Sequence, residues 1–330
     1  MIYKSKGFLF ALFIFAFFNC AYPQQYFIKT YTIEDSLPTR FVLDVTQDKS
    51  GMMWFATYSG ISNYDGLSFA NYNSKDGLAE QNYRRLKFDS NDILWALPFN
   101  INDTICYFKD NKWFKISTLC DSISKQETTC FSVMVKDGKT SICIGTTIGF
   151  YTYENDVWKH YKFSDNLSEN LVTAIDVKGD KFLLSGGFGF CEYSNGNLDF
   201  RLNDIFGKYN DIKTFFINRK ETSLNEIWVL GPDWIGVLRG NEFQLVKEGL
   251  EIPVLPYHSH SYMTIDKAGN LIFGNGWAKY YFEKRTNEIK TLQIKNGFSS
   301  NGATSIYKDR EDNIWFADTR GIDKINNLDL

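Results

Sequence analysis

The chain has 330 residues, of which 44% are hydrophobic and 23% charged, a balance that excludes an intrinsically disordered polypeptide. Its 36 Lys and Arg against 39 Asp and Glu give a net charge of -3, and no basic run occurs, so the chain lacks the positive stripe of a general nucleic-acid-binding protein. Aromatic residues make up 17% of the chain and only 6 residues are proline, which favours one large β domain.

The N-terminus predicts export. Lys4 and Lys6 precede an unbroken apolar run over residues 8–18, which is too short to span a bilayer as a helix and fits a secretory signal peptide. We expect a signal peptide over residues 1–21, a single domain over residues 22–330, and a periplasmic or extracellular location. Two alternatives stay open, a lipoprotein attached through Cys20 and an uncleaved anchor, although Cys20 lacks the usual small residue before it. No later run of 18 apolar residues predicts a membrane span.

The remaining cysteines are odd in number and show no CxxC spacing. Export permits disulfides, but this pattern does not impose any. We expect buried thiols that act as small hydrophobic side chains in strands. The residues concerned are Cys106, Cys120, Cys130, Cys143 and Cys191.

An internal repeat with a period in the low forties predicts the fold. Seven units align on a large or aliphatic residue, which we expect on the second of four strands, where it fills the gap to a neighbouring unit. The aligned residues are Trp54, Trp95, Cys143, Leu183, Trp228, Ile272 and Trp315. The predicted fold is all-β, a seven-bladed β-propeller with four antiparallel strands in each blade.

Turn residues recur at fixed offsets from the aligned position. An Asp lies six residues before it in five units and is expected to open the turn between the first two strands: Asp48, Asp89, Asp137, Asp266 and Asp309. A Gly lies six residues after it in four units and is expected to begin the third strand: Gly60, Gly149, Gly189 and Gly321.

The strand count predicts how the ring closes. The seventh unit ends at residues 321–327 and lacks a fourth strand, whereas residues 26–32 form an extra strand before the first unit. We therefore expect the N-terminal strand to complete the last blade and remove an exposed sheet edge. The fourth strand of unit four is expected over residues 197–201, and no helix of 12 residues is predicted.

Several of these segments resemble a known repeat. They are residues 31–38 (YTIEDSLP), 47–57 (QDKSGMMWFAT), 60–66 (GISNYDG) and 308–319 (KDREDNIWFADT). The chain is similar here to the two-component regulator propeller repeat, with a close match in the first and seventh units and a match mainly in spacing in units three to five. The resemblance implies a non-catalytic, extracytoplasmic ligand-binding sensor domain. A downstream kinase module would then be the partner, either in a longer form of this chain or in a separate polypeptide.

Candidate ligand residues lie in the loops that join one blade to the next and in those between the second and third strands. These loops share one face, where ligands approach the centre of a propeller, and their aromatic, Arg and Asn side chains suit a carbohydrate or another small molecule. Each of these residues has an alternative role in packing loops together. The candidates are Arg40, Tyr58, Tyr83, Arg84, Phe99, Asn100, Phe188, Trp234, His258, His260, Trp277 and Arg320.

Other functions are less well supported by the sequence. His258 and His260 lack a third ligand at motif spacing, so no metal site and no cofactor are expected. No hydrolase, nucleotide-binding or kinase motif is present, which predicts that the chain is not itself an enzyme. The alternatives are a glycosidase of the sialidase type, because the Asp-to-Trp turn resembles the Asp-box, and a protein-interaction propeller of the cell envelope.

Overall fold

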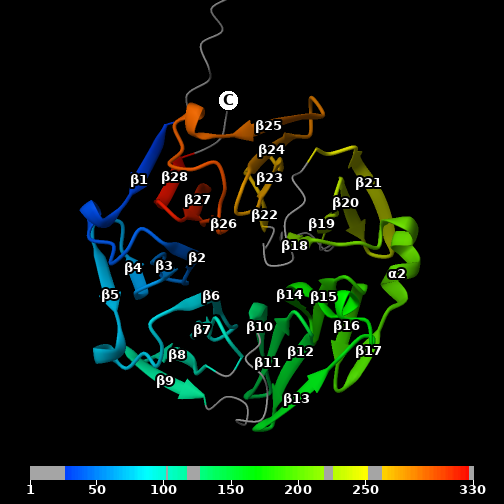
Figure 1. The fold of residues 1–330 in the computed structure, drawn as a ribbon, viewed down its shortest axis with the longest axis horizontal. Helices are drawn as coiled ribbons and strands as arrows, with labels where there is room; N and C mark the ends of the chain where they lie inside the picture. Colours follow the sequence, from blue (N-terminus) through cyan, green and yellow to red (C-terminus); the bar gives the residue numbers. More distant parts are fainter. Residues whose placement is uncertain (1–26, 102, 117–126, 219–225, 252–261, 327–330) are drawn as a thin grey trace, which may run out of the picture.

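The computed structural model describes residues 27–101, 103–116, 127–218, 226–251 and 262–326. Seven four-stranded antiparallel sheets stand around one axis like blades, with the first strand of each nearest the centre (Figure 1). The predicted seven-bladed β-propeller is confirmed. Among the described residues, no helix is both long enough and apolar enough to cross a membrane.

Each blade is an antiparallel sheet of four strands in spatial order. Blades 1 to 3 are β2 (Val42–Gln47), β3 (Met53–Thr57), β4 (Gly60–Tyr64) and β5 (Phe69–Tyr72); β6 (Tyr83–Phe88), β7 (Leu94–Pro98), β8 (Ile105–Lys109) and β9 (Lys112–Ile116); and β10 (Thr128–Lys136), β11 (Lys139–Thr146), β12 (Gly149–Glu154) and β13 (Val157–Tyr161). Blades 4 and 5 are β14 (Val172–Lys178), β15 (Lys181–Gly186), β16 (Gly189–Ser194) and β17 (Asn197–Asp199); and β18 (Thr214–Asn218), β19 (Glu226–Leu230), β20 (Trp234–Arg239) and β21 (Glu242–Glu248). Blades 6 and 7 are β22 (Tyr262–Ile265), β23 (Leu271–Gly274), β24 (Lys279–Glu283) and β25 (Glu288–Leu292); and β26 (Ser305–Lys308), β27 (Asn313–Asp318), β28 (Gly321–Asn326) and β1 (Ile28–Tyr31).

The ring closes as predicted, because the N-terminal strand β1 pairs with β28 in blade 7. The antiparallel register runs from Ile28 opposite Ile325 to Tyr31 opposite Ile322. Gly321 opens β28 with a φ of 136°, and a Cβ at this position would lie 2.3 Å from the Tyr31 carbonyl oxygen. Only glycine fits this close approach, so the pairing of β1 with β28 requires a glycine at the turn before β28.

The seven aligned residues have the predicted packing role. Each lies in a different hydrophobic cluster, and each cluster is shared with the following blade; Trp54 of blade 1, for example, packs with Tyr83 and Leu94 of blade 2. The last interface, between blades 7 and 1, contains Trp315 and the β1 residue Tyr31. One repeated position therefore supplies an apolar side chain to every interface of the ring.

The Asp turns explain the Asp-to-Trp spacing. Asp48, Asp89 and Asp309 each accept a hydrogen bond from the indole N–H of the Trp six residues later, at 3.1, 2.9 and 2.7 Å. Their other carboxylate oxygen accepts from backbone N–H groups of the turn, as at Met52 and at the residue two positions after Asp48. Asp137 differs from the prediction: it adopts a φ of 51° inside a two-residue hairpin and does not open a longer turn.

A short helix replaces the end of one predicted strand. The fourth strand of blade 4 stops at Asp199, and α2 (Arg201–Phe206) follows. Its Leu202 and Phe206, four residues apart on one face, are buried against blades 4 and 5. The other described helices are 3-10 turns: η1 (Ile33–Asp35), η2 (Ser74–Asp76), η3 (Leu167–Asn170), η4 (Gly207–Tyr209) and η5 (Ile294–Asn296).

Candidate functional site

The candidate ligand residues differ in how far they reach solvent. Arg40 and Arg320 are exposed, and the exposed fractions of Tyr58 and Trp277 are 44% and 68%. Arg84, Phe99, Asn100 and Phe188 are half-buried, whereas Tyr83 and Trp234 are buried. His258 and His260 lie outside the described residues.

Three of the candidates meet between blades 1 and 2: Tyr58 in the turn after β3, Arg84 in β6, and Phe99 directly after β7. The Tyr58 ring lies between two other aromatic rings, 5.5 Å from Phe41 and 5.6 Å from Phe99, all measured between ring centroids. The Arg84 guanidinium lies 4.5 Å from the centroid of the Phe99 ring. We call Phe41, Tyr58, Phe99 and Arg84 the aromatic ladder. Phe41, which is 49% exposed, was not among the predicted residues, although its position beside Arg40 in a loop between blades could have indicated it.

Arg84 is held in place by contacts to the next blade. Its guanidinium donates a hydrogen bond to the Thr128 carbonyl at 2.6 Å and forms an ion pair with Glu127 at 3.4 Å. Burial lowers the pKa of Arg84, and the neighbouring positive charge of Arg85 lowers it further. Because both contacts fix the plane of the guanidinium, Arg84 presents a pre-oriented cation behind the aromatic rings.

The contact of Arg84 with Thr128 belongs to a repeated set of hydrogen bonds between blades. At the equivalent position of three other blades, a threonine hydroxyl donates to a carbonyl at the start of the first strand of the next blade or just before it. These pairs are Thr129 to Val172 at 2.7 Å, Thr173 to Ile212 at 3.2 Å, and Thr304 to Val42 at 2.6 Å. Arg84 thus fills a structural position and carries a charge that the threonines lack.

Charged side chains also meet across the axis of the ring. Arg85 of blade 2 donates to the Tyr262 hydroxyl of blade 6, and its guanidinium lies 5.0 Å from the centroid of the Tyr262 ring. Lys87, two residues further along β6, forms a 2.7 Å ion pair with Asp176 of blade 4. These contacts join blades that are not neighbours in the ring, so side chains bridge its centre. Burial raises the pKa of Tyr262 to about 12, which keeps its hydroxyl protonated.

Three other candidates have structural contacts. The Tyr83 hydroxyl accepts hydrogen bonds from the backbone N–H groups of Ala79 and Glu80, at 3.1 and 3.0 Å. Trp234 packs in the core between blades 4 and 5, and Phe188 stacks on the partly buried Phe163. The structure therefore does not bring these side chains to the aromatic ladder.

The described residues include no group of three or more His, Cys, Asp or Glu side chains that could hold a metal ion. The described cysteines, Cys106, Cys130, Cys143 and Cys191, are free thiols, and burial raises the pKa of each. This agrees with the predicted packing role for these four residues, while Cys120 lies outside the described residues.

Comparisons with solved structures show proteins of the same fold. The extracellular domain of a hybrid two-component system of B. thetaiotaomicron superposes with a TM-score of 0.69 and 21% identity, over 92% of this chain and 41% of that one. A second such domain from the same organism gives 0.65 and 16%, over 93% and 40%. Virginiamycin B lyase from Staphylococcus aureus gives 0.62 and 14%, over 92% and 100%. No family model and no curated protein matches the chain.

These likenesses confirm the propeller fold. The two sensor-system domains also fit the resemblance to the two-component regulator propeller repeat that the sequence indicates. The chain spans about two fifths of the length of those two structures. The lyase has the same fold at a similar level of structural likeness, so the fold alone does not separate a binding propeller from an enzyme.

Proposed function

We propose that the chain is the extracytoplasmic ligand-binding propeller of a two-component sensor, that it recognises a carbohydrate or another small molecule, and that it is not itself an enzyme. The observation that carries this proposal is the aromatic ladder, in which solvent-exposed rings and a fixed guanidinium lie together on one face. The fold shared with extracellular domains of hybrid two-component systems supports it.

The chemistry of the ladder suits a sugar. Tyr58 and Phe41 expose 44% and 49% of their surface, and such rings can stack on the apolar face of a pyranose. The Tyr58 hydroxyl and the Arg84 guanidinium can hydrogen-bond ring substituents or a carboxylate. Arg40, Trp277 and Arg320 lie in loops on the same side of their blades and are proposed to extend the site.

Signalling would follow from a shift in population. The ligand would favour one of two arrangements between the propeller and a downstream kinase module, which lies in a longer form of the chain or in a separate polypeptide. The signal peptide over residues 1–21 would deliver the domain to the periplasm or the cell surface. No chemical step in the propeller is needed.

A glycan array followed by thermal-shift titration of residues 22–330 tests this function. We expect saturable binding of a glycan that is recovered unchanged. Tyr58→Ala should bind it roughly fivefold more weakly, because a ring that stacks on a ligand is worth about 1 kcal/mol. Phe114→Ala is the matched control, because Phe114 is exposed to 39% on the outer strand β9, away from the ladder.

Three results would overturn the proposal. A hydrolysed glycan would indicate a glycosidase, and an eliminated product would indicate a lyase. The absence of any small-molecule response, together with co-purification of an envelope protein, would indicate a protein-interaction propeller.

A further inference from the structure

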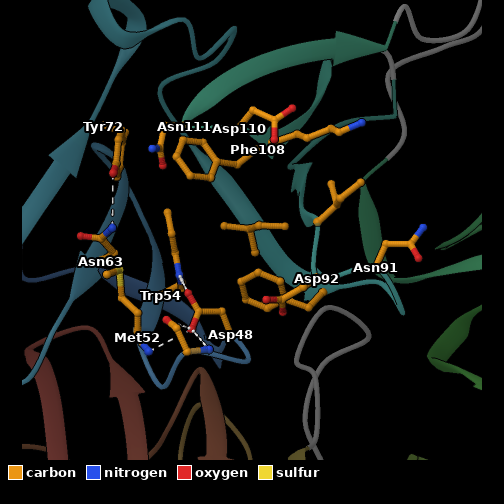
Figure 2. A pocket seen from close by; sticks show the side chains of 15 residues that line it. Asp48, Met52, Trp54, Asn63, Tyr72, Asn91, Asp92, Phe108, Asp110 and Asn111 are labelled. Carbon is orange, nitrogen blue, oxygen red and sulfur yellow. Dashed lines mark hydrogen bonds between the residues drawn. The ribbon is translucent and has the colours of Figure 1, made fainter.

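A groove opens between blades 1 and 2 on the face opposite the aromatic ladder. The turns β2–β3 and β6–β7 and the hairpin β8–β9 border it (Figure 2). Its volume is about 670 Å³. In an antiparallel blade these turns lie at the other end of the strands from the loops that carry Tyr58 and Phe99. The groove is therefore separate from the proposed ligand site.

Aromatic rings form one wall of this groove. Tyr72 is stacked on Trp54, with ring centroids 5.7 Å apart and an interplanar angle of 17°. Phe108 lies 5.1 Å from Trp54 and 5.5 Å from Tyr72, and it closes the wall from blade 2. Tyr72 and Phe108 are only half-buried, so ring surface is available to a cation in the groove.

Carboxylates from three different turns line the same groove. They belong to Asp48, Asp92 and Asp110, and none of them forms an ion pair with a described residue. The one cation among the lining residues is Lys109. The nearby Lys49 directs its ammonium to the Ser90 carbonyl at 2.8 Å, and its backbone N–H donates a hydrogen bond to the Asp92 carboxylate at 3.1 Å.

The equivalent groove between blades 2 and 3 has the opposite charge. It has a similar volume of about 610 Å³ and a similar aromatic lining, which includes Trp95 and Tyr107. Its charged residues are Lys109, Lys139 and Asp156, and the Asp156 carboxylate accepts a hydrogen bond from Tyr153 at 2.7 Å. The excess of carboxylates thus distinguishes the groove between blades 1 and 2 from its neighbour, although both are built from equivalent turns of the repeat.

We infer that the groove between blades 1 and 2 docks a basic polypeptide segment of a partner protein, with an Arg or Lys side chain against the Tyr72–Phe108 wall. The charge complementarity argues for a cation. The Asp48 carboxylate already accepts hydrogen bonds from the Trp54 indole and from its own turn, so cationic side chains are expected at Asp92 and Asp110. These two carboxylates belong to two separate turns on the rim, an arrangement that suits successive cationic side chains of a peptide better than a single small amine.

Fluorescence anisotropy at low salt tests the inference with residues 22–330 and a labelled seven-residue peptide in which Gly and Arg alternate. The test variant combines Asp92→Asn with Asp110→Asn, and the control combines Asp137→Asn with Asp156→Asn. All four residues have a φ between 49° and 65°, which Asn tolerates, so both variants keep their turns and lose the same charge. We expect the test variant to bind roughly threefold to tenfold more weakly than the wild type, as two partly exposed ion pairs allow.

The control variant should keep the affinity of the wild type, and a peptide with citrulline in place of Arg should not bind. Equal weakening of both variants, equal binding of the citrulline peptide, or no binding of the Arg peptide to the wild type would overturn the inference. So would binding of free arginine as tightly as the peptide, because it would indicate a small-amine site. The glycan titration with Tyr58→Ala measures the other face, so each failure can be recognised separately.

Discussion

Trp315 offers the sharpest test of how the ring is held closed. Its side chain is 2% exposed, and its ring is stacked on Tyr31 of the closing strand β1, with centroids 5.8 Å apart. The indole N–H donates to the Asp309 carboxylate at 2.7 Å. The same ring lies 5.8 Å from Phe55 of blade 1. Trp315 therefore joins the first strand, the last blade and the first blade.

Trp315→Ala should lower the free energy of unfolding by about 4 kcal/mol or more. Truncation of a buried Trp costs about 3–5 kcal/mol through lost burial and the cavity that remains. The lost hydrogen bond adds about 1 kcal/mol, because a buried carboxylate oxygen of Asp309 is left with fewer donors. A loss of this size is a large part of the stability of an ordinary domain.

Urea unfolding followed by circular dichroism measures this loss. The matched control is Trp277→Ala, which removes the same side chain from a position that is 68% exposed and should change stability by no more than about 0.5 kcal/mol. A loss below about 1 kcal/mol for Trp315→Ala, or equal losses for both variants, would refute the account of the closure.

Three further predictions follow from particular residues. Gly321→Ala should lower the free energy of unfolding, measured in urea, by more than about 2 kcal/mol, because its Cβ would meet the backbone of β1. The control Gly138→Ala should lower it by about 1 kcal/mol, because Gly138 has a φ of 73° but open space around it, and equal losses would contradict the close approach. Burial lowers the pKa of Lys279 to about 8, below its unfolded value of 10.5, so the folded state binds fewer protons than the unfolded state between these pH values. The free energy of unfolding of the wild type relative to Lys279→Met should therefore rise from pH 8 to 10.5 in urea unfolding. A flat or falling difference would refute this. In native residues 22–330, a thiol reagent should label no more than Cys120 and the half-buried Cys130, and after unfolding it should label all five cysteines. Rapid labelling of Cys106, Cys143 or Cys191 in the native protein would contradict their burial.

The repeat made most of the fold predictable. The same turn and strand pattern occurs seven times, so each of the seven aligned residues lies on the second strand of its blade, as predicted. The closure by β1 followed from counting strands. The helix α2 could not be predicted, because a six-residue segment with two apolar side chains has no clear period until blades 4 and 5 are present to bury it.

The candidate site was less predictable, because a loop position does not determine which way a side chain points. Trp234 and Tyr58 both lie beside the turn between the second and third strands, but Trp234 packs inward and Tyr58 reaches solvent. The contact of Arg85 with Tyr262 joins residues 177 positions apart across the ring axis. Such a pairing depends on the diameter of the closed ring and on rotamers, which a strand pattern does not specify.

Hydrogen exchange with the first glycan that binds saturably shows where the propeller holds its ligand. We expect slower amide exchange in the loops around residues 40–41, 58–59 and 99–100, with the glycan recovered chemically intact. Protection from exchange only in the turns of the opposite face would show that the glycan does not bind at the aromatic ladder. Conversion of the glycan during the experiment would show that the propeller does more than bind it.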